Sequence, residues 1–252
     1  MSVVTVPNSS SLGKQARFPV FVFLTSSIGR KWIVALTGLA LLGFVIGHLL
    51  GNLQFFLPNK EIFNNYAAKL QALGPLLWII RLGLLAVFVT HILTTISLVV
   101  ENRKARPKKY EVFTPKKSTR ASRTMALSGL TVLSFVIYHI LHFTVIAFHP
   151  IYKTLVDPSG HHDIYSRMVL GFNQPIIAGF YILSVTLLAI HLKHGISSTV
   201  QTLGIKSARV AGLVDNGGKI LSLAIAVGFI SIPLSVILHL QGLPAWSTLT
   251  LK

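Results

Sequence analysis

Five long apolar runs dominate this chain and restrict it to folds that a lipid bilayer can hold. Each run has at least the roughly 20 residues that a membrane-spanning helix needs. They cover residues 32–57, 76–100, 124–148, 175–200 and 220–240. Only 12% of the residues are charged, whereas soluble domains carry about a quarter. The sequence therefore predicts an all-α membrane protein, with five transmembrane helices in one bundle.

Proline and glycine mark the predicted helix ends. Gly74-Pro75 opens the second run and Gln174-Pro175 opens the fourth, as proline does near helix starts. Gly217-Gly218 precedes the fifth run. We divide the chain into an N-terminal segment (1–31), the transmembrane domain (32–240) and a C-terminal tail (241–252).

Lysine and arginine predict the orientation, because they concentrate in cytoplasmic loops. All but six of the 23 lysines and arginines fall on the side that holds the N-terminus and the loop between the second and third runs. The six on the opposite side are Lys60, Lys69, Arg81, Lys153, Arg167 and Lys252. We therefore expect a cytoplasmic N-terminus and an outer C-terminus.

The remaining composition excludes several classes of function. The net charge of +17 is explained by topology and anionic lipid, since basic residues gather at helix ends rather than alternating with aromatics as in nucleic-acid sites. An acidic partner on the cytoplasmic side also fits this charge. The chain has no cysteine, so an iron–sulfur centre would belong to another subunit. Residues 18–24 are too short to span, and no cleavage site follows them.

Four histidines lie deep in the first four runs. His48 and His139 are each about 22–24 Å from the cytoplasmic start of their helix, at 1.5 Å per residue. His91 and His191 lie equally far along helices that run the opposite way. The histidines thus form two pairs, His48 with His139 in the outer half and His91 with His191 in the inner half. Such pairs suit the two axial ligands of a haem b.

A buried structural histidine, bonded to a carbonyl or a serine, is the alternative reading of each site. Four independent structural histidines would have no reason to fall into two layers, so we favour haem ligands. Gly51 and Gly195 lie one turn from His48 and His191 and would leave room for a flat macrocycle. Close helix packing explains such glycines equally well.

These residues resemble the single-subunit dihaem cytochrome b of bacterial succinate dehydrogenase and fumarate reductase. The similarity covers nearly the whole chain from Ser26 onward. It rests on GHLLGN around His48, THILTT around His91, YHILHFT around His139 and HLKHGISSTVQTLG from His191. By this resemblance, the family's four axial ligands fall on these four histidines, which would hold two stacked b haems.

The resemblance implies a membrane anchor in the bacterial inner membrane. A cytoplasmic flavoprotein and an iron–sulfur subunit would bind it, and electrons would pass through the inner and outer haems and exchange with menaquinone. Dicarboxylate chemistry would belong to the flavoprotein. The basic loop with Lys104, Arg106, Lys108 and Lys109 would meet the iron–sulfur subunit. The oligomeric state, including a higher oligomer of the complex, stays open.

The quinone site is less defined. Ser27, Arg30 and Lys31 offer hydrogen-bond donors at the inner end, although a charged helix flank explains them too. Glu61 is a candidate proton acceptor at the outer end, with a solvated loop glutamate as the alternative. His142 and His194 lie one turn beyond His139 and His191. We expect them near a haem rim, bonded to a propionate, a water chain or a quinone.

Two other classes share some of these features. A cytochrome b anchor of a hydrogenase or formate dehydrogenase also holds two haems, but usually with four helices and different histidine placement. A histidine-dependent transporter or proton channel should show membrane-embedded carboxylates or broken helical repeats, which the sequence does not indicate.

Overall fold

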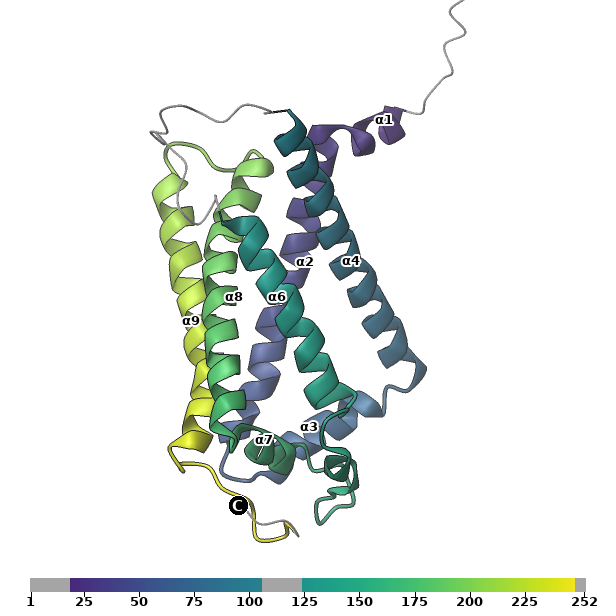
Figure 1. The fold of residues 1–252 in the computed structure, drawn as a ribbon, viewed down its shortest axis with the longest axis vertical. Helices are drawn as coiled ribbons and strands as arrows, with labels where there is room; N and C mark the ends of the chain where they lie inside the picture. Colours follow the sequence, from purple (N-terminus) through teal and green to yellow (C-terminus); the bar gives the residue numbers. More distant parts are fainter. Residues whose placement is uncertain (1–18, 106–123, 248–252) are drawn as a thin grey trace, which may run out of the picture.

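The protein is an elongated bundle of helices that run side by side (Figure 1). The structure is a computed structural model, and it describes residues 19–105 and 124–247. The long helices are α2 (Ser27–Leu53), α4 (Pro75–Lys104), α6 (Met125–His139), α8 (Pro175–Thr202) and α9 (Ala211–Ile237). The short ones are α1 (Pro19–Thr25), α3 (Glu61–Gln71) and α7 (Ile164–Phe172). No strand occurs within these described ranges, apart from an isolated bridge between Val156 and His162.

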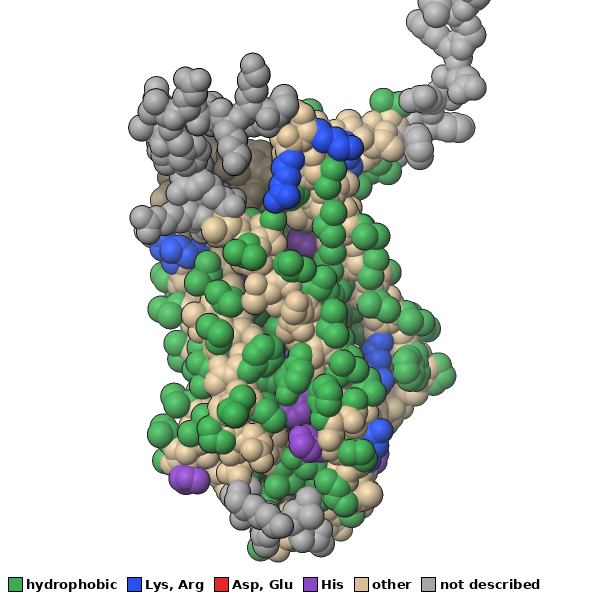
Figure 2. All heavy atoms as spheres, in the orientation of Figure 1, with side chains coloured by type: hydrophobic (Ala, Val, Ile, Leu, Met, Phe, Trp, Pro, Cys, Tyr) green, Lys and Arg blue, Asp and Glu red, His purple; other side chains and the backbone are tan. Residues whose placement is uncertain are grey.

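The five predicted spans are confirmed as helices long and apolar enough to cross a membrane. Hydrophobic side chains cover the length of the bundle, and Lys and Arg lie mainly toward its ends (Figure 2). Ile79 and Leu223 are 67% and 64% exposed, which a bilayer favours and water does not. The chain is therefore a multi-pass membrane protein. We call its two ends the α1 end and the α7 end (Figure 1).

The predicted start of the fifth helix was wrong. Helix α9 begins at Ala211, so Gly217-Gly218 lies inside it rather than before it. Gly218 is buried, and a Cβ there would lie 3.3 Å from Cγ2 of Ile196 in α8. This glycine allows α8 and α9 to pack closely, as small residues do between membrane helices.

The third span ends earlier than the apolar run predicts. Helix α6 continues through a π-helical turn, Ile140–Thr144, in which the amide of Val145 donates to the carbonyl of Ile140 at 2.8 Å. Ile146 then adopts a φ of 55°, and the chain leaves the helix. A 3₁₀ turn, Pro150–Thr154, leads toward α7.

Two short helices that the sequence did not predict, α3 and α7, lie across one end of the bundle (Figure 1). Helix α7 is almost wholly buried. Asp163 caps it by accepting from the amide of Ser166 at 3.0 Å. The main apolar core, which includes Phe55, Val169 and Tyr181, is built where α7 meets the long helices. The core is thus concentrated near the α7 end.

Helix α1 meets α2 at a sharp corner, and the chain turns away from the bundle there (Figure 1). Ser26 caps α2 by accepting from the amide of Gly29 at 3.0 Å. A Cβ on Gly29 would lie 1.9 Å from the carbonyl oxygen of Phe23, so the corner requires glycine. Val22, Phe23 and Leu24 are exposed, as apolar side chains of a helix at a membrane surface are.

Candidate functional site

An apolar cavity of about 1820 Å³ runs through the bundle between α2, α4, α6 and α8. All four predicted ligands line it: His48, His91, His139 and His191. Histidine side chains are visible from outside between the helices on the face shown in Figure 2. The structure therefore brings together, around one cavity, residues that come from four different helices.

The rings of His48 and His139 form the first pair. Their centres lie 5.8 Å apart, and their planes are nearly perpendicular at 82°. Phe44 stacks on His48 with ring centres 5.4 Å apart, and Phe135 contacts His139 at 5.9 Å. The two phenylalanines lie four residues before their histidines, so each pairs with its histidine along one helix face.

His91 and His191 form the second pair and are held in matching ways. Nδ1 of His91 lies 3.0 Å from the hydroxyl of Thr37, and Nδ1 of His191 lies 3.0 Å from the hydroxyl of Ser128. The next residue in each case is a glycine against which the ring rests. A Cβ on Gly38 would lie 3.2 Å from Cε1 of His91, and one on Gly129 would lie 3.5 Å from Cε1 of His191.

The matching pairs reflect an internal repeat that sequence reasoning missed. Residues 35–39 read ALTGL and 126–130 read ALSGL, while 44–50 read FVIGHLL and 135–141 read FVIYHIL. In both α2 and α6 the hydroxyl precedes the histidine by 11 residues, about three turns. Helices α4 and α8 each begin with proline, 16 residues before their histidine. His48 thus corresponds to His139, and His91 to His191.

This repeat supports the predicted pairing by depth. Thr37 and Ser128 each lie about 16 Å along their helix from His48 and His139. His91 and His191 contact these hydroxyls. Both therefore lie at the depth of Thr37 and Ser128 in the bundle, rather than at the depth of His48 and His139. One pair therefore lies toward the α7 end and the other toward the α1 end.

The structure separates the two extra histidines from the cavity. Neither His142 nor His194 lines it. His142 is only 2% exposed, and its Nδ1 lies 3.0 Å from the hydroxyl of Tyr181, while Nε2 has no hydrogen-bond partner among the described residues. The same hydroxyl lies 3.4 Å from Nδ1 of His139. Tyr181 thus links His142 to the predicted ligand.

The two predicted glycines line the cavity in different ways. Gly195 has open space where a side chain would be. A Cβ on Gly51, by contrast, would lie 2.7 Å from the hydroxyl of Tyr66 in α3. Gly51 therefore makes room for Tyr66, which also lines the cavity.

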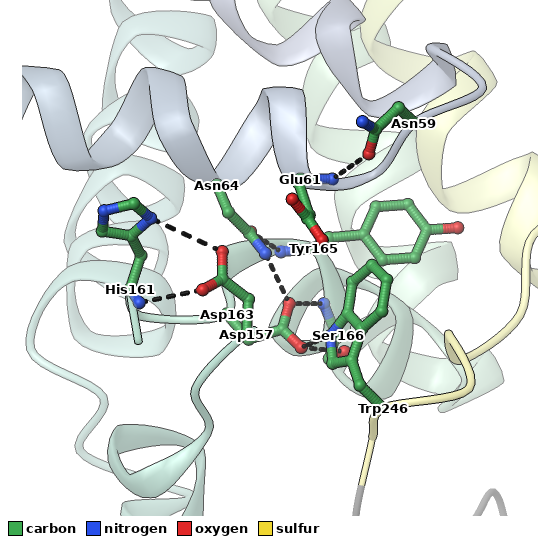
Figure 3. A network of polar contacts seen from close by, with 9 residues as sticks. All are labelled: Asn59, Glu61, Asn64, Asp157, His161, Asp163, Tyr165, Ser166 and Trp246. Carbon is green, nitrogen blue, oxygen red and sulfur yellow. Dashed lines mark hydrogen bonds and ion pairs between the residues drawn. The ribbon is translucent and has the colours of Figure 1, made fainter. Parts of the chain in front are cut away.

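Of the predicted quinone-binding residues, Lys31 alone lines the cavity. Arg30 forms a bidentate ion pair with Glu101 of α4, in which Nη2 and Oε2 lie 2.7 Å apart. Ser27 begins α2 outside the cavity lining. Glu61 begins α3, and its amide donates to the side chain of Asn59 at 3.0 Å (Figure 3). Arg30 thus joins α2 to α4 at the α1 end.

Arg167 is a cavity residue that the sequence did not single out. It lies on α7, is only 7% exposed, and its Nε donates to the carbonyl of Tyr152 at 2.7 Å. Burial lowers the pKa of Arg167, and the Asp163 carboxylate opposes that shift. A cation in the part of the cavity lining formed by α7 would suit an anionic group there. Only the short amphipathic α7 places it there, which the apolar runs could not reveal.

A buried polar network stabilises the short helices α3 and α7 at the α7 end of the bundle (Figure 3). The carboxylate of Asp163 accepts from the side chains of Asn64 at 3.1 Å, Ser166 at 2.5 Å and Trp246 at 2.9 Å. Burial and the Asp163 charge raise the pKa of Tyr165 to about 12. This network ties α3, α7 and the C-terminal segment together below the cavity.

No group of three or more metal-binding side chains occurs in the described ranges. No family model, curated protein or solved structure matches the chain.

Proposed function

We propose that this chain is the dihaem cytochrome b anchor of a bacterial succinate:quinone oxidoreductase. The observation that carries the proposal is the arrangement of two repeat-related histidine pairs around one apolar cavity at two levels. The resemblance of the histidine motifs supports the choice of family.

The residues around the cavity fit two haem groups. His48 and His139 lie with their ring centres 5.8 Å apart, and imidazole nitrogen is a common ligand of haem iron. The cavity is long and mainly apolar, which suits a flat macrocycle, and Arg167 and Lys31 offer cations toward its two ends. His48 and His139 would hold one haem, and His91 and His191 the other. When bound, haem b supplies a one-electron ferric–ferrous couple.

In this proposal the chain lies in the bacterial inner membrane, with the α1 end in the cytoplasm and the C-terminus outside. The flavoprotein and the iron–sulfur subunit dock at the α1 end, and menaquinone is the membrane substrate. Lys31 is the remaining inner candidate for quinone binding, because Arg30 is paired with Glu101. Glu61 is the outer candidate.

The proposal is tested by purifying the tagged chain from its native membrane in mild detergent. An optical spectrum should show low-spin b haem, and native mass spectrometry should show two haems with a flavoprotein and an iron–sulfur subunit. A dihaem spectrum with hydrogenase or formate dehydrogenase subunits would instead support the alternative anchor. Absence of haem would refute both.

The basic loop provides a second test of the partner side. Lys104 lies in the last turn of α4, whereas Arg106, Lys108 and Lys109 lie outside the described residues. Reversing these four charges to glutamate should weaken association with the iron–sulfur subunit and leave both haem spectra intact. Lys153→Glu, at the opposite end, is the matched control. If assembly is unchanged, the charges of this loop only set the orientation of the chain in the membrane.

A further inference from the structure

The hydrogen atoms of two hydroxyls determine the tautomers of His91 and His191. The hydroxyl of Thr37 donates to the carbonyl of Ile33 at 2.6 Å, and that of Ser128 donates to the carbonyl of Met125 at 3.1 Å. A hydroxyl carries a single hydrogen. Toward the imidazoles, 3.0 Å away, both oxygens can then only accept.

With the hydroxyl hydrogens directed at these carbonyls, Nδ1 would carry the proton in both rings and donate to the hydroxyl oxygen. In a neutral imidazole the other nitrogen, Nε2, then presents its lone pair. A metal-bound histidine needs this arrangement, in which the second nitrogen donates to an oxygen that orients the ring. The ring of His91 in α4 is thus oriented by α2, and the ring of His191 in α8 by α6.

The preparation is built from the same short motif in each half of the chain. The hydroxyl residue bonds the ring, and the following glycine, Gly38 or Gly129, lets the ring lie against the helix. The other pair lacks this device. No hydrogen-bond partner of the His48 ring is seen among the described residues, and His139 shares the more distant Tyr181 hydroxyl with His142.

We propose that Thr37 and Ser128 are positioning residues that fix the tautomers of His91 and His191 and lower the potential of the haem bound at the α1 end. The inference rests on the proposed function. An Nδ1–H that donates to an oxygen makes the imidazole a more basic ligand, which favours the ferric state. The effect is confined to one haem, because the His48–His139 pair does not contact these hydroxyls.

The test is a potentiometric titration of both haems in the purified complex with Thr37→Val, Ser128→Ala and the double variant. Losing one such contact should change the ferric-to-ferrous affinity ratio about tenfold, which is a rise of 59 mV for a one-electron couple. The second haem should keep its potential. Thr37→Ser and Ser128→Thr retain the hydroxyl and should restore the original value.

Thr131→Val is the matched control, because Thr131 also bonds a carbonyl of α6, that of Leu127, without contacting a histidine. Equal potentials in Thr37→Val, Ser128→Ala and Thr131→Val would overturn the inference while leaving two haems and the proposed function intact. A wild-type complex without haem would instead refute the proposed function. If the Thr37→Val protein does not accumulate, the haem potentials of Ser128→Ala, Thr37→Ser and Ser128→Thr test the same inference.

Discussion

The two repeated halves of the bundle, residues 27–104 and 125–202, carry the same histidine pattern but are packed differently. Helix α8 lies against α9 and buries Ala178, Tyr181 and Ser184. Its counterpart α4 has no buried residue and packs chiefly against α2. Helix α8 is therefore supported by protein, whereas α4 faces the cavity and the surroundings of the bundle.

This difference shows that the repeat sets the histidine pattern, whereas the packing against α9 distinguishes α8 from α4. In membranes, helices associate through close packing rather than through expulsion of water. A helix with few protein contacts depends on whatever fills the space beside it. We expect bound haem to provide much of that contact for α4.

The largest effect should come from removing a histidine ligand. His91→Leu or His191→Leu should abolish mainly the haem at the α1 end, and His48→Leu or His139→Leu mainly the other, because each iron loses an axial bond. Optical and potentiometric resolution of the two haems measures this. If His91→Leu and His48→Leu removed the same haem, the pairing across the halves would be wrong.

The second-largest effect should come from withholding haem, which should reveal a difference in amide protection between α4 and α8. In protein produced by a haem-deficient strain, the amides of α4 should exchange with deuterium faster than those of α8, because α4 lacks buried contacts. Hydrogen-exchange mass spectrometry of the solubilised chain measures both helices at once. Equal protection of α4 and α8 without haem would show that lipid or α2 alone holds α4.

An alanine at the two equivalent glycines should sharpen the comparison. A Cβ on Gly38 would lie 3.2 Å from His91, which is tighter than ordinary contact, whereas one on Gly129 would lie 3.5 Å from His191. We expect Gly38→Ala to lower occupancy of the α1-end haem severalfold and Gly129→Ala to be tolerated. Haem-to-protein ratios from pyridine haemochrome assays distinguish them, and equal losses would contradict the difference in space.

The ion pairs at the α1 end allow a smaller test. Arg30–Glu101 joins α2 to α4, and Lys206–Asp215 joins the α8–α9 loop to α9. Exposed pairs of this kind contribute little on average. Arg30→Gln should nevertheless increase protease sensitivity of α4 more than Lys206→Gln does of α9, because α4 has few other contacts. Timed proteolysis with mass mapping of fragments is the measurement, and the reverse order would be contrary evidence.

The smallest effect is expected at His142 and His194, which lie outside the cavity lining. His142→Gln should retain both haems but shift the potential of the His139 haem through Tyr181, the shared hydroxyl partner. His194→Gln should retain both haems and alter quinone kinetics at most. Loss of a haem in His142→Gln, with haem kept in His139→Gln, would reverse our choice of ligand.

The sequence predicted those features that depend on the length of the apolar runs and on the rise per residue of a helix. The five spans and the meeting of His48 with His139 followed from these two quantities. It did not predict α3 and α7, because these helices are short and only partly apolar and are ordered by contacts such as Asn64 with Asp163. Gly217-Gly218 was misplaced, because a glycine that ends a helix and one that admits a neighbouring helix look alike in a single sequence.

The candidate site was predictable only in part for a similar reason. Histidines stand out in apolar runs, whereas Thr37 and Ser128 resemble ordinary hydroxyl residues of membrane helices until their contacts are known. Arg167 was counted among the outer cations, and its burial depends on the packing of α7. The repeat could have been found by aligning residues 35–50 with 126–141, since ten of the sixteen aligned positions are identical.

The corner between α1 and α2 has a consequence for the position of α2 in the bundle. Because Gly29 presses against the carbonyl of Phe23, α1 cannot be drawn into line with α2, and its exposed apolar side chains keep it at the membrane surface. We expect it therefore to oppose any sliding of α2 along its axis. A slip of one turn would move His48 by about 5.4 Å, enough to carry it out of level with His139.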